Sequence, residues 1–226
     1  MFTGIIEAIG VVAAIQSAGI DSRLYVKTEK LSLDNVQLGD SIAVNGICLT
    51  VIELPGDGFW ADVSGETLSK TAFNYLKVGS RVNLEKAVQA TTHLGGHLVS
   101  GHVDGIGKII QRSDAGRSVF FKIKAPDEIA KYIAAKGSIT INGISLTVNA
   151  VNGSLFELNI VPHTLTQTTL NECYAGNFVN LEVDIIARYL ERLLLGDKAS
   201  QEQASQEQKQ QGLTLEKLAD FGFIKN

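Results

Sequence analysis

Asn45-Gly-Ile-Cys-Leu-Thr-Val51 is the stretch that decides the fold, because it recurs as Asn142-Gly-Ile-Ser-Leu-Thr-Val148. The copies are offset by 97 positions, and 26 residues coincide when 1–97 are aligned without gaps to 98–194. Each repeat is far longer than the units that stack in solenoid proteins. The sequence therefore predicts a duplicated domain, with a first copy at 1–97 and a second at 98–184.

Each repeat is expected to be built mainly from short β-strands. Asn-Gly is a strong signal for a two-residue hairpin turn, and strand-like residues precede it at 41–45 and 138–142. Alternating apolar residues predict further strands at 59–63 and 156–160. Short helices are expected at 67–76, 125–133 and 164–174. Several short strands separated by regular turns favour a small barrel or sandwich.

The C-terminal part follows a different pattern. Apolar residues recur at helical spacing, and a glycine is placed to end the helix: Ile185, Ile186, Tyr189, Leu190, Leu193, Leu194 and Gly196. This helix, 185–196, either contacts another subunit or packs on its own barrel, and the residues leave both readings open. Residues 197–226 begin with a Gln-, Ser-, Lys- and Glu-rich stretch, which predicts a flexible polar tail. The apolar residues Leu213, Leu215, Leu218 and Phe221 predict a last short amphipathic helix.

Composition excludes several classes of protein. The chain has 226 residues, a net charge of −4 and no long basic run, so nucleic acid is not an expected partner. The N-terminus lacks the features of a signal peptide, and no apolar window is long enough for a transmembrane helix. Cys48 and Cys173 make no disulfide framework in a chain of this length, which favours a reducing cytoplasm.

The densest polar stretch is His93-Leu-Gly-Gly-His97-Leu-Val-Ser-Gly-His102-Val-Asp104, which holds three of the four histidines. A metal site is not expected, because both cysteines lie far away in the sequence and no His-Glu-x-x-His motif is present. A histidine that handles protons is the favoured interpretation. A buried histidine that is merely satisfied by the backbone is the alternative.

Differences between the repeats are informative, because a duplicated domain offers two related pockets. At matched positions Cys48 corresponds to Ser145, Ile5 to His102, Glu66 to His163, and Ala87 to Asp184. Reactive groups differ while the surrounding residues are kept. This pattern suits two pockets with unequal roles, such as donor and acceptor. A duplicated structural unit with one site or none is the alternative.

Four motifs carry a resemblance to a known family. They are Met1-Phe-Thr-Gly-Ile-Ile-Glu7, Asn45-Gly-Ile-Cys-Leu-Thr50, Gly95-Gly-His-Leu-Val-Ser-Gly-His-Val-Asp-Gly105 and Asn142-Gly-Ile-Ser-Leu-Thr147. The chain resembles riboflavin synthases from Met1 to about Leu195. The resemblance implies a mainly β fold of two six-stranded Greek-key barrels of the riboflavin synthase type, followed by a C-terminal α-helix through which three subunits associate.

The resemblance also implies an activity. Two molecules of 6,7-dimethyl-8-ribityllumazine would dismutate by transfer of a four-carbon unit, giving riboflavin and 5-amino-6-(D-ribitylamino)uracil. One substrate would sit in an N-terminal barrel and the other in the C-terminal barrel of a neighbouring subunit. No cofactor and no metal are implied, and lumazine synthase is a candidate partner. The alternative function is that of the lumazine proteins, which resemble this family and carry their ligand without catalysis.

The family's site residues are carried over by position. The first pocket would comprise Gly4, Ile5, Ile6, Cys48, Leu49, Thr50, Asp62, Val63, Ser64, Gly65, Glu66 and Thr67. The second would comprise Gly101, His102, Val103, Ser145, Leu146, Thr147, Asn159, Ile160, Val161, Pro162, His163 and Thr164, with Lys136 nearby at the close of a helix.

Catalytic roles can be assigned within these pockets as hypotheses. We expect His102 to transfer a proton, and Cys48 and Ser145 to polarise the ring or assist the addition of a nucleophile. Asp184 would orient or protonate a group in the second barrel. Phe2 and Thr3 form either a lid over the first pocket or simply an ordered terminus.

Overall fold

In the computed structural model, which describes residues 1–196, both Asn-Gly motifs form the expected tight turns. Asn45 and Gly46 have φ angles of 48° and 78°, and Asn142 and Gly143 have 46° and 82°. A type I′ turn needs positive φ at both central residues, which Gly adopts freely and Asn more readily than most residues. The two predicted hairpins are thereby confirmed.

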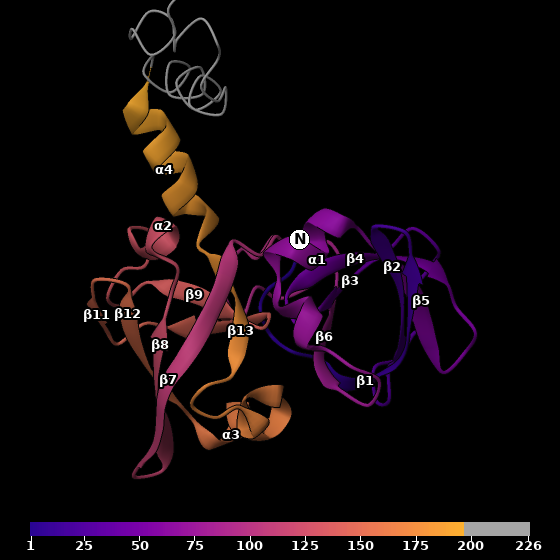
Figure 1. Cartoon of the computed structure of the whole chain (residues 1–226), viewed down its shortest axis with the longest axis horizontal. Coiled ribbons are helices and arrows are strands. Elements are labelled where there is room, and N and C mark those ends of the chain that lie inside the picture. The colour runs from indigo at the N-terminus through magenta and orange to yellow at the C-terminus, as the bar shows by residue number, and fades with distance from the viewer. Residues whose placement is uncertain (197–226) are drawn as a thin grey trace, which may run out of the picture. The chain divides into compact units, whose positions relative to one another are not determined.

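The first repeat folds into a closed six-stranded barrel, coloured indigo to purple in Figure 1. Its strands are β1 (Ala8–Ala18), β2 (Asp21–Lys27), β3 (Ser41–Val44), β4 (Ile47–Glu53), β5 (Gly58–Val63) and β6 (Arg81–Lys86). Their order around the barrel is β1-β2-β5-β4-β3-β6, a Greek-key connection of antiparallel strands. Residues that alternate along the strands, such as Leu24, Phe59 and Leu84, fill one apolar core.

The second repeat forms a curled seven-stranded sheet. Its strands are β7 (Gly105–Ala115), β8 (Ser118–Lys124), β9 (Ser138–Ile141), β10 (Ile144–Thr147), β11 (Ala150–Asn152), β12 (Leu155–Ile160) and β13 (Phe178–Val183). The order is β10-β9-β13-β7-β8-β12-β11. Strands β10 and β11 together match β4, interrupted at Val148 and Asn149, whose N–H groups bind the carbonyls of Gly137 and Glu157. The Greek-key order is therefore preserved, with one strand split in two.

Short helices follow the fifth strand of each repeat. They are α1 (Gly65–Lys70) with the 3₁₀-helix η1 (Ala72–Tyr75), and α3 (Pro162–Gln167) with η2 (Thr169–Glu172). Between β8 and β9, α2 (Asp127–Ala130) is shorter than the expected helix at 125–133. Beyond Ala130 the backbone tightens into i→i−3 hydrogen bonds, so Ile133 is buried without continuing the helix.

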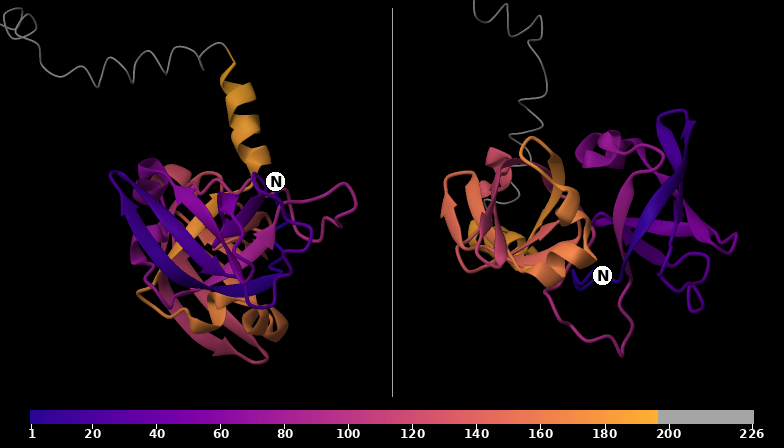
Figure 2. Two further views of the ribbon diagram at one scale, coloured as in Figure 1. Left: turned by 90° about the vertical axis from the view of Figure 1, so that its right-hand side faces the viewer. Right: turned by 90° about the horizontal axis from the view of Figure 1, so that it is seen from below.

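The two repeats belong to one compact unit, Met1–Ile185, and Figure 2 shows them side by side. Asn83 Nδ2 donates to the carbonyl of Asn142 and Asn180 Nδ2 donates to that of Asn45, each at 2.9 Å. The Asn-Gly turns themselves touch, because a Cβ on Gly46 would lie 2.7 Å from the nitrogen of Gly143. These reciprocal contacts relate the repeats by an approximate two-fold axis.

The second unit, Ile186–Asn226, is described as far as Gly196. The described part is the helix α4 (Ile185–Leu195), which confirms the expected helix, and Gly196 ends it with a φ of 49°. Its apolar side chains are exposed: Ile186, Tyr189, Leu190, Leu193 and Leu194. The helix expected around Leu213–Phe221, like the flexible tail, lies outside the described residues.

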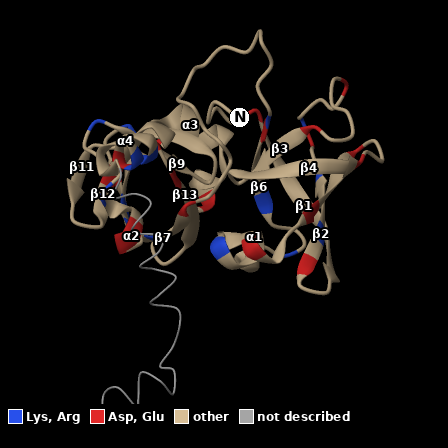
Figure 3. Cartoon of the chain, turned by 90° about the horizontal axis from the view of Figure 1, so that it is seen from above, with Lys and Arg blue, Asp and Glu red and all other residues tan. Residues whose placement is uncertain are grey.

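Acidic and basic residues are interspersed over both repeats in Figure 3. This distribution agrees with the weak net charge and with the absence of a basic run in the sequence. Within residues 1–196, no helix has the length and apolar character required to cross a membrane.

Candidate functional site

The chain segments that precede the two barrels each cross to the opposite barrel. The carbonyl of Gly4 accepts a hydrogen bond from the backbone N–H of Ser145, and the carbonyl of Gly101 accepts one from Cys48, both at 2.8 Å. Ile6 packs against the core of the second barrel, and Val103 packs against the core of the first. The predicted grouping of pocket segments is therefore wrong in one respect: residues 4–6 belong with Ser145, and residues 101–103 belong with Cys48.

Cys48 lies half-buried under these crossing residues. Phe2 is 1% exposed, is paired with Val99 through two backbone hydrogen bonds of 2.7 and 3.1 Å, and packs in the same small cluster as Cys48. Gly101 has a φ of 81°, and a Cβ on it would lie 2.7 Å from the Cβ of Cys48. Phe2 is thus an ordered, buried residue that packs beside Cys48.

Ser145 has a different set of neighbours. Its hydroxyl lies 2.7 Å from Nδ1 of His97, and the other ring nitrogen of His97 lies 3.3 Å from the hydroxyl of Thr140. Burial lowers the pKa of His97, and the negative charge of Asp184 opposes that shift. A neutral imidazole bonded to a hydroxyl can accept a proton from it. His97, which is outside the predicted set, therefore contacts the predicted residue Ser145 and is influenced by the charge of the predicted residue Asp184.

Comparison with known proteins assigns this arrangement to a family. The family model of the lumazine binding domain matches twice, at residues 3–87 and 100–184. The riboflavin synthase of Photobacterium phosphoreum is 52% identical over 99% of this chain and 100% of its own length. That of Bacillus subtilis (strain 168) is 40% identical over 99% of this chain and 100% of its own length. The chain belongs to the riboflavin synthase family. The resemblance inferred from the four motifs is confirmed.

A solved structure related to the riboflavin synthase family supports the fold. LumP in complex with 6,7-dimethyl-8-(1'-D-ribityl)lumazine is 26% identical, with a TM-score of 0.73, over 81% of this chain and 99% of that chain. LumP with riboflavin is 27% identical, with a TM-score of 0.75 over the same shares. The double-barrel architecture therefore also occurs in a protein crystallised with lumazine and flavin ligands.

The remaining pocket segments predicted for the riboflavin synthase family lie at matching places in the two barrels. Residues 62–67 run from the end of β5 into α1, where Ser64 Oγ accepts from the N–H of Thr67 at 3.2 Å. Residues 159–164 run from β12 into α3, where Val161 occupies the N-cap position without a side-chain hydrogen bond and Pro162 begins the helix. Thr50 and Thr147 are exposed ends of the strand pairs that carry Cys48 and Ser145.

Two predicted residues stand apart from these groups. The ring of His102 is exposed and, among the described residues, makes no hydrogen bond, while its backbone N–H donates to Ser100 Oγ. Lys136 does not close a helix as expected, because α2 ends at Ala130. It occupies the turn before β9 with a φ of 67°, its side chain exposed and its N–H bonded to the carbonyl of Val148.

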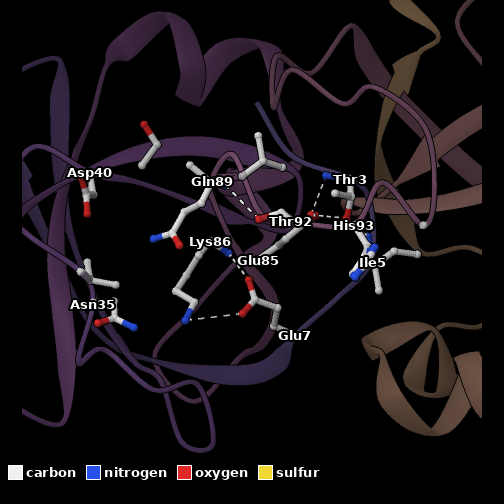
Figure 4. A pocket seen from close by; sticks show the side chains of 15 residues that line it. Thr3, Ile5, Glu7, Asn35, Asp40, Glu85, Lys86, Gln89, Thr92 and His93 are labelled. Atoms are coloured by element: carbon white, nitrogen blue, oxygen red, sulfur yellow. Dashed lines mark hydrogen bonds and ion pairs between the residues drawn. The ribbon is translucent and has the colours of Figure 1, made fainter.

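A cavity of about 560 Å³ opens on the first barrel, and its walls include neither Cys48 nor Ser145. Ile5 is its only wall residue from the predicted pockets, and Glu7, Glu85, Lys86 and His93 supply polar groups (Figure 4). Lys86 is already bonded to Glu7 and to the carbonyl of Ser32. Within residues 1–196, no cluster of three or more His, Cys, Asp or Glu is arranged to hold a metal ion.

Two kinds of residue were missed by sequence reasoning. His97 lies in the predicted histidine stretch, but its matched position is Leu194, so the comparison of repeats gave it no partner. Glu85 and Glu182 repeat at the ends of Val82-Asn-Leu-Glu85 and Val179-Asn-Leu-Glu182 and are 3% and 4% exposed. An acid kept in both copies of an apolar strand was a signal that could have marked them.

Proposed function

We propose that this chain makes riboflavin by dismutation of two molecules of 6,7-dimethyl-8-ribityllumazine, with 5-amino-6-(D-ribitylamino)uracil as the second product. Membership of the riboflavin synthase family supports the reaction. The observation that carries it in the molecule is the pair of crossed sites, in which one barrel presents Cys48 and the other presents Ser145 bonded to His97. Two related but unequal sites suit two copies of one substrate with different fates.

Ser145, His97 and Asp184 form the proton-handling group of this proposal. The reaction removes a proton from the C7 methyl of one lumazine, and a nucleophile adds to the other. His97, held neutral by burial, takes a proton through the Ser145 hydroxyl, and the nearby charge of Asp184 stabilises the protonated ring. General acid–base help of this kind contributes about 10²–10⁴-fold to a rate. Cys48 takes the corresponding place in the first barrel and polarises the other ring.

Positioning contributes more than any one side chain. Holding two reactants in the correct geometry supplies roughly 7–11 kcal/mol. The ring edges would be read by backbone groups of residues 4–6 and 101–103, and the ribityl hydroxyls by threonines that follow the paired strands. The exposed His102 and Lys136 are free to act on a substrate shared with a neighbouring subunit. No cofactor and no metal enter this scheme.

The intersubunit arrangement is part of the proposal. The apolar side of α4, with Leu190, Leu193 and Leu194 more than half exposed, would be covered by two further copies of the helix in a homotrimer. One substrate would then sit in the first barrel of one subunit and the other in the second barrel of its neighbour. The protein would act in the cytoplasm, where association with lumazine synthase would shorten the path of the substrate.

A ligand carrier without catalysis is the second candidate, favoured by the likeness to LumP. The residues His102, Ser145, Thr147 and Asp184 argue against it, because a carrier has no use for a full polar set in the second barrel. Incubation of the purified chain with 6,7-dimethyl-8-ribityllumazine separates the two. Riboflavin absorbance that grows with time is expected. Stable binding of one lumazine per chain, without conversion, would leave only the carrier.

A further inference from the structure

Glu85, in β6 of the first barrel, is a buried carboxylate whose hydrogen-bond donors all come from the first crossing segment. Its Oε1 accepts from the N–H of Thr3 at 2.6 Å and from the Thr3 hydroxyl at 2.7 Å, and its Oε2 accepts from the N–H of Gly4 at 3.0 Å. Within residues 1–196 it forms no ion pair. A buried charge without an ion pair must be compensated by hydrogen bonds. Glu85 and the segment therefore hold one another in place.

Glu182, in β13, repeats the arrangement for the second crossing segment. Its Oε1 accepts from the N–H and the hydroxyl of Ser100 at 2.6 and 2.7 Å, and its Oε2 accepts from the N–H of Gly101 at 3.0 Å. Burial raises the pKa of both carboxyl groups, and the hydrogen bonds from the segments oppose the shift. Each glutamate with its three hydrogen-bond donors is called a latch below, and the two latches have donors of the same kind at the same distances.

Each latch holds a crossing segment that contacts the opposite barrel. Glu182 belongs to the second barrel, but the carbonyl of Gly101 and the side chain of Val103 contact the first barrel, beside Cys48. Glu85 belongs to the first barrel, but Gly4 and Ile6 contact the second barrel, beside Ser145.

We infer that Glu85 and Glu182 are positioning residues that act crosswise, Glu182 setting the geometry of the Cys48 site and Glu85 that of the Ser145 site. Their importance for turnover rests on the proposed function, but the crossed coupling itself is a property of the fold. If each glutamate only stabilised its own barrel, its replacement would loosen that barrel. If it acts crosswise, its replacement loosens the site in the opposite barrel.

Glutamine is the informative replacement, because it keeps the size of the side chain. The single oxygen of glutamine can accept from the two donors of Ser100, but these bonds are then no longer charge-assisted. The NH₂ group faces the N–H of Gly101, so the third hydrogen bond is lost and two donors oppose each other. Loss of one such bond raises the open population of the segment about tenfold or more. A thiol covered by the segment should react faster by the same factor.

The experiment measures alkylation by iodoacetamide at each thiol, read by peptide mass spectrometry. Native Cys48 reports on the first barrel, and Ser145→Cys in a Cys48→Ser background reports on the second. Cys173 is the internal reference, because burial raises the pKa of its thiol to about 11 and its reaction follows general loosening.

Glu182→Gln should accelerate alkylation of Cys48 about tenfold and change the reporter at position 145 less than twofold. Glu85→Gln should reverse that preference. Equal effects at both reporters, a larger effect in the substituted barrel, or no effect would overturn the inference. If alkylation of Cys173 also accelerates, the milder Ser100→Ala decides. It removes one of the three donors to Glu182, together with the acceptor of the His102 N–H in the same segment. It must accelerate Cys48 relative to the reporter at position 145 by about threefold, and otherwise the inference fails. Riboflavin production is measured separately, so an inactive chain with crossed labelling would refute only the proposed function.

Discussion

Replacing Gly101 by alanine tests the close approach of the second crossing segment to Cys48. Gly101 has a φ of 81°, a region that residues with a side chain adopt at a cost. The added Cβ would also lie 2.7 Å from Cys48 Cβ and 2.8 Å from Cε2 of Phe2, and real Cβ atoms do not approach neighbours so closely. Phe2 cannot yield easily, because it is fully buried and paired with Val99.

The expected cost has two parts. Left-handed backbone costs an alanine about 1–2 kcal/mol, and overpacking of a tight contact costs about 1–3 kcal/mol. Gly101→Ala should therefore destabilise the folded chain by about 2–5 kcal/mol. Gly116→Ala is the matched control, since Gly116 has a φ of 67° but no neighbouring atom within 4 Å of the place that an added Cβ would take, so only the first part applies.

Denaturant unfolding of both variants measures the difference in the free energy of unfolding, and the riboflavin assay measures activity. Gly101→Ala should be the less stable of the two by about 1–3 kcal/mol, and it should lose activity while Gly116→Ala keeps it. The activity falls because the carbonyl of Gly101 can no longer bind the N–H of Cys48 in its present geometry. Equal stability and equal turnover for the two variants would refute the crossed packing.

Three further predictions follow from other contacts. His97→Gln should lower kcat about 10²–10⁴-fold. Because burial lowers the pKa of His97, the neutral ring stabilises the fold above about pH 6.5, and this contribution is lost as the pH falls. The melting temperature of the variant should therefore decline less on acidification than that of the unchanged chain. Asn83→Ala should lower the free energy of unfolding, measured with denaturant, by about 1–3 kcal/mol, because it leaves buried groups between the barrels unpaired. Arg81→Ala, at the exposed ion pair between the barrels, should lower it by less than about 1 kcal/mol, and similar losses for the two variants would contradict this ranking. Leu190→Glu should yield monomers of reduced activity in sedimentation and turnover measurements, and fully active monomers would exclude an intersubunit site.

Local sequence signals predicted the strands and turns, because they depend on neighbours in the chain. The Asn-Gly turns need positive φ, and the sequence places at both turns the residues that tolerate it. The split of β10 from β11 had no such signal: Asn149 replaces Ile52 at the matched position, but its bond to Glu157 is a feature of tertiary structure. The same limit applies to α2, whose apolar residues continue past the point where the helix ends.

The structure brings the matched segments together differently from the grouping that the alignment suggested. Alignment of the two repeats establishes which residues are equivalent, but equivalence is not proximity. When two copies are related by a two-fold axis and exchange a segment, the first segment meets the second barrel, and the alignment looks the same as without exchange. Gly4 and Gly101 were therefore identified as a matched pair, but each was assigned to the wrong partner strand.

The unequal chemistry of the two sites has a topological cause. The segments before the two barrels cross symmetrically, so Cys48 and Ser145 each donate a backbone N–H to the carbonyl of a matched glycine. The connection between the barrels is not symmetric, because the chain passes from the first barrel to the second only once. His97 lies on that connection, where its N–H binds the carbonyl of Thr3 and its ring reaches Ser145. The position matched to it is Leu194 in α4, which cannot supply an imidazole. A duplicated chain of this form therefore places an imidazole beside Ser145 and none at the matched position beside Cys48. Under the proposed function, donor and acceptor roles can therefore differ although the barrels share one fold.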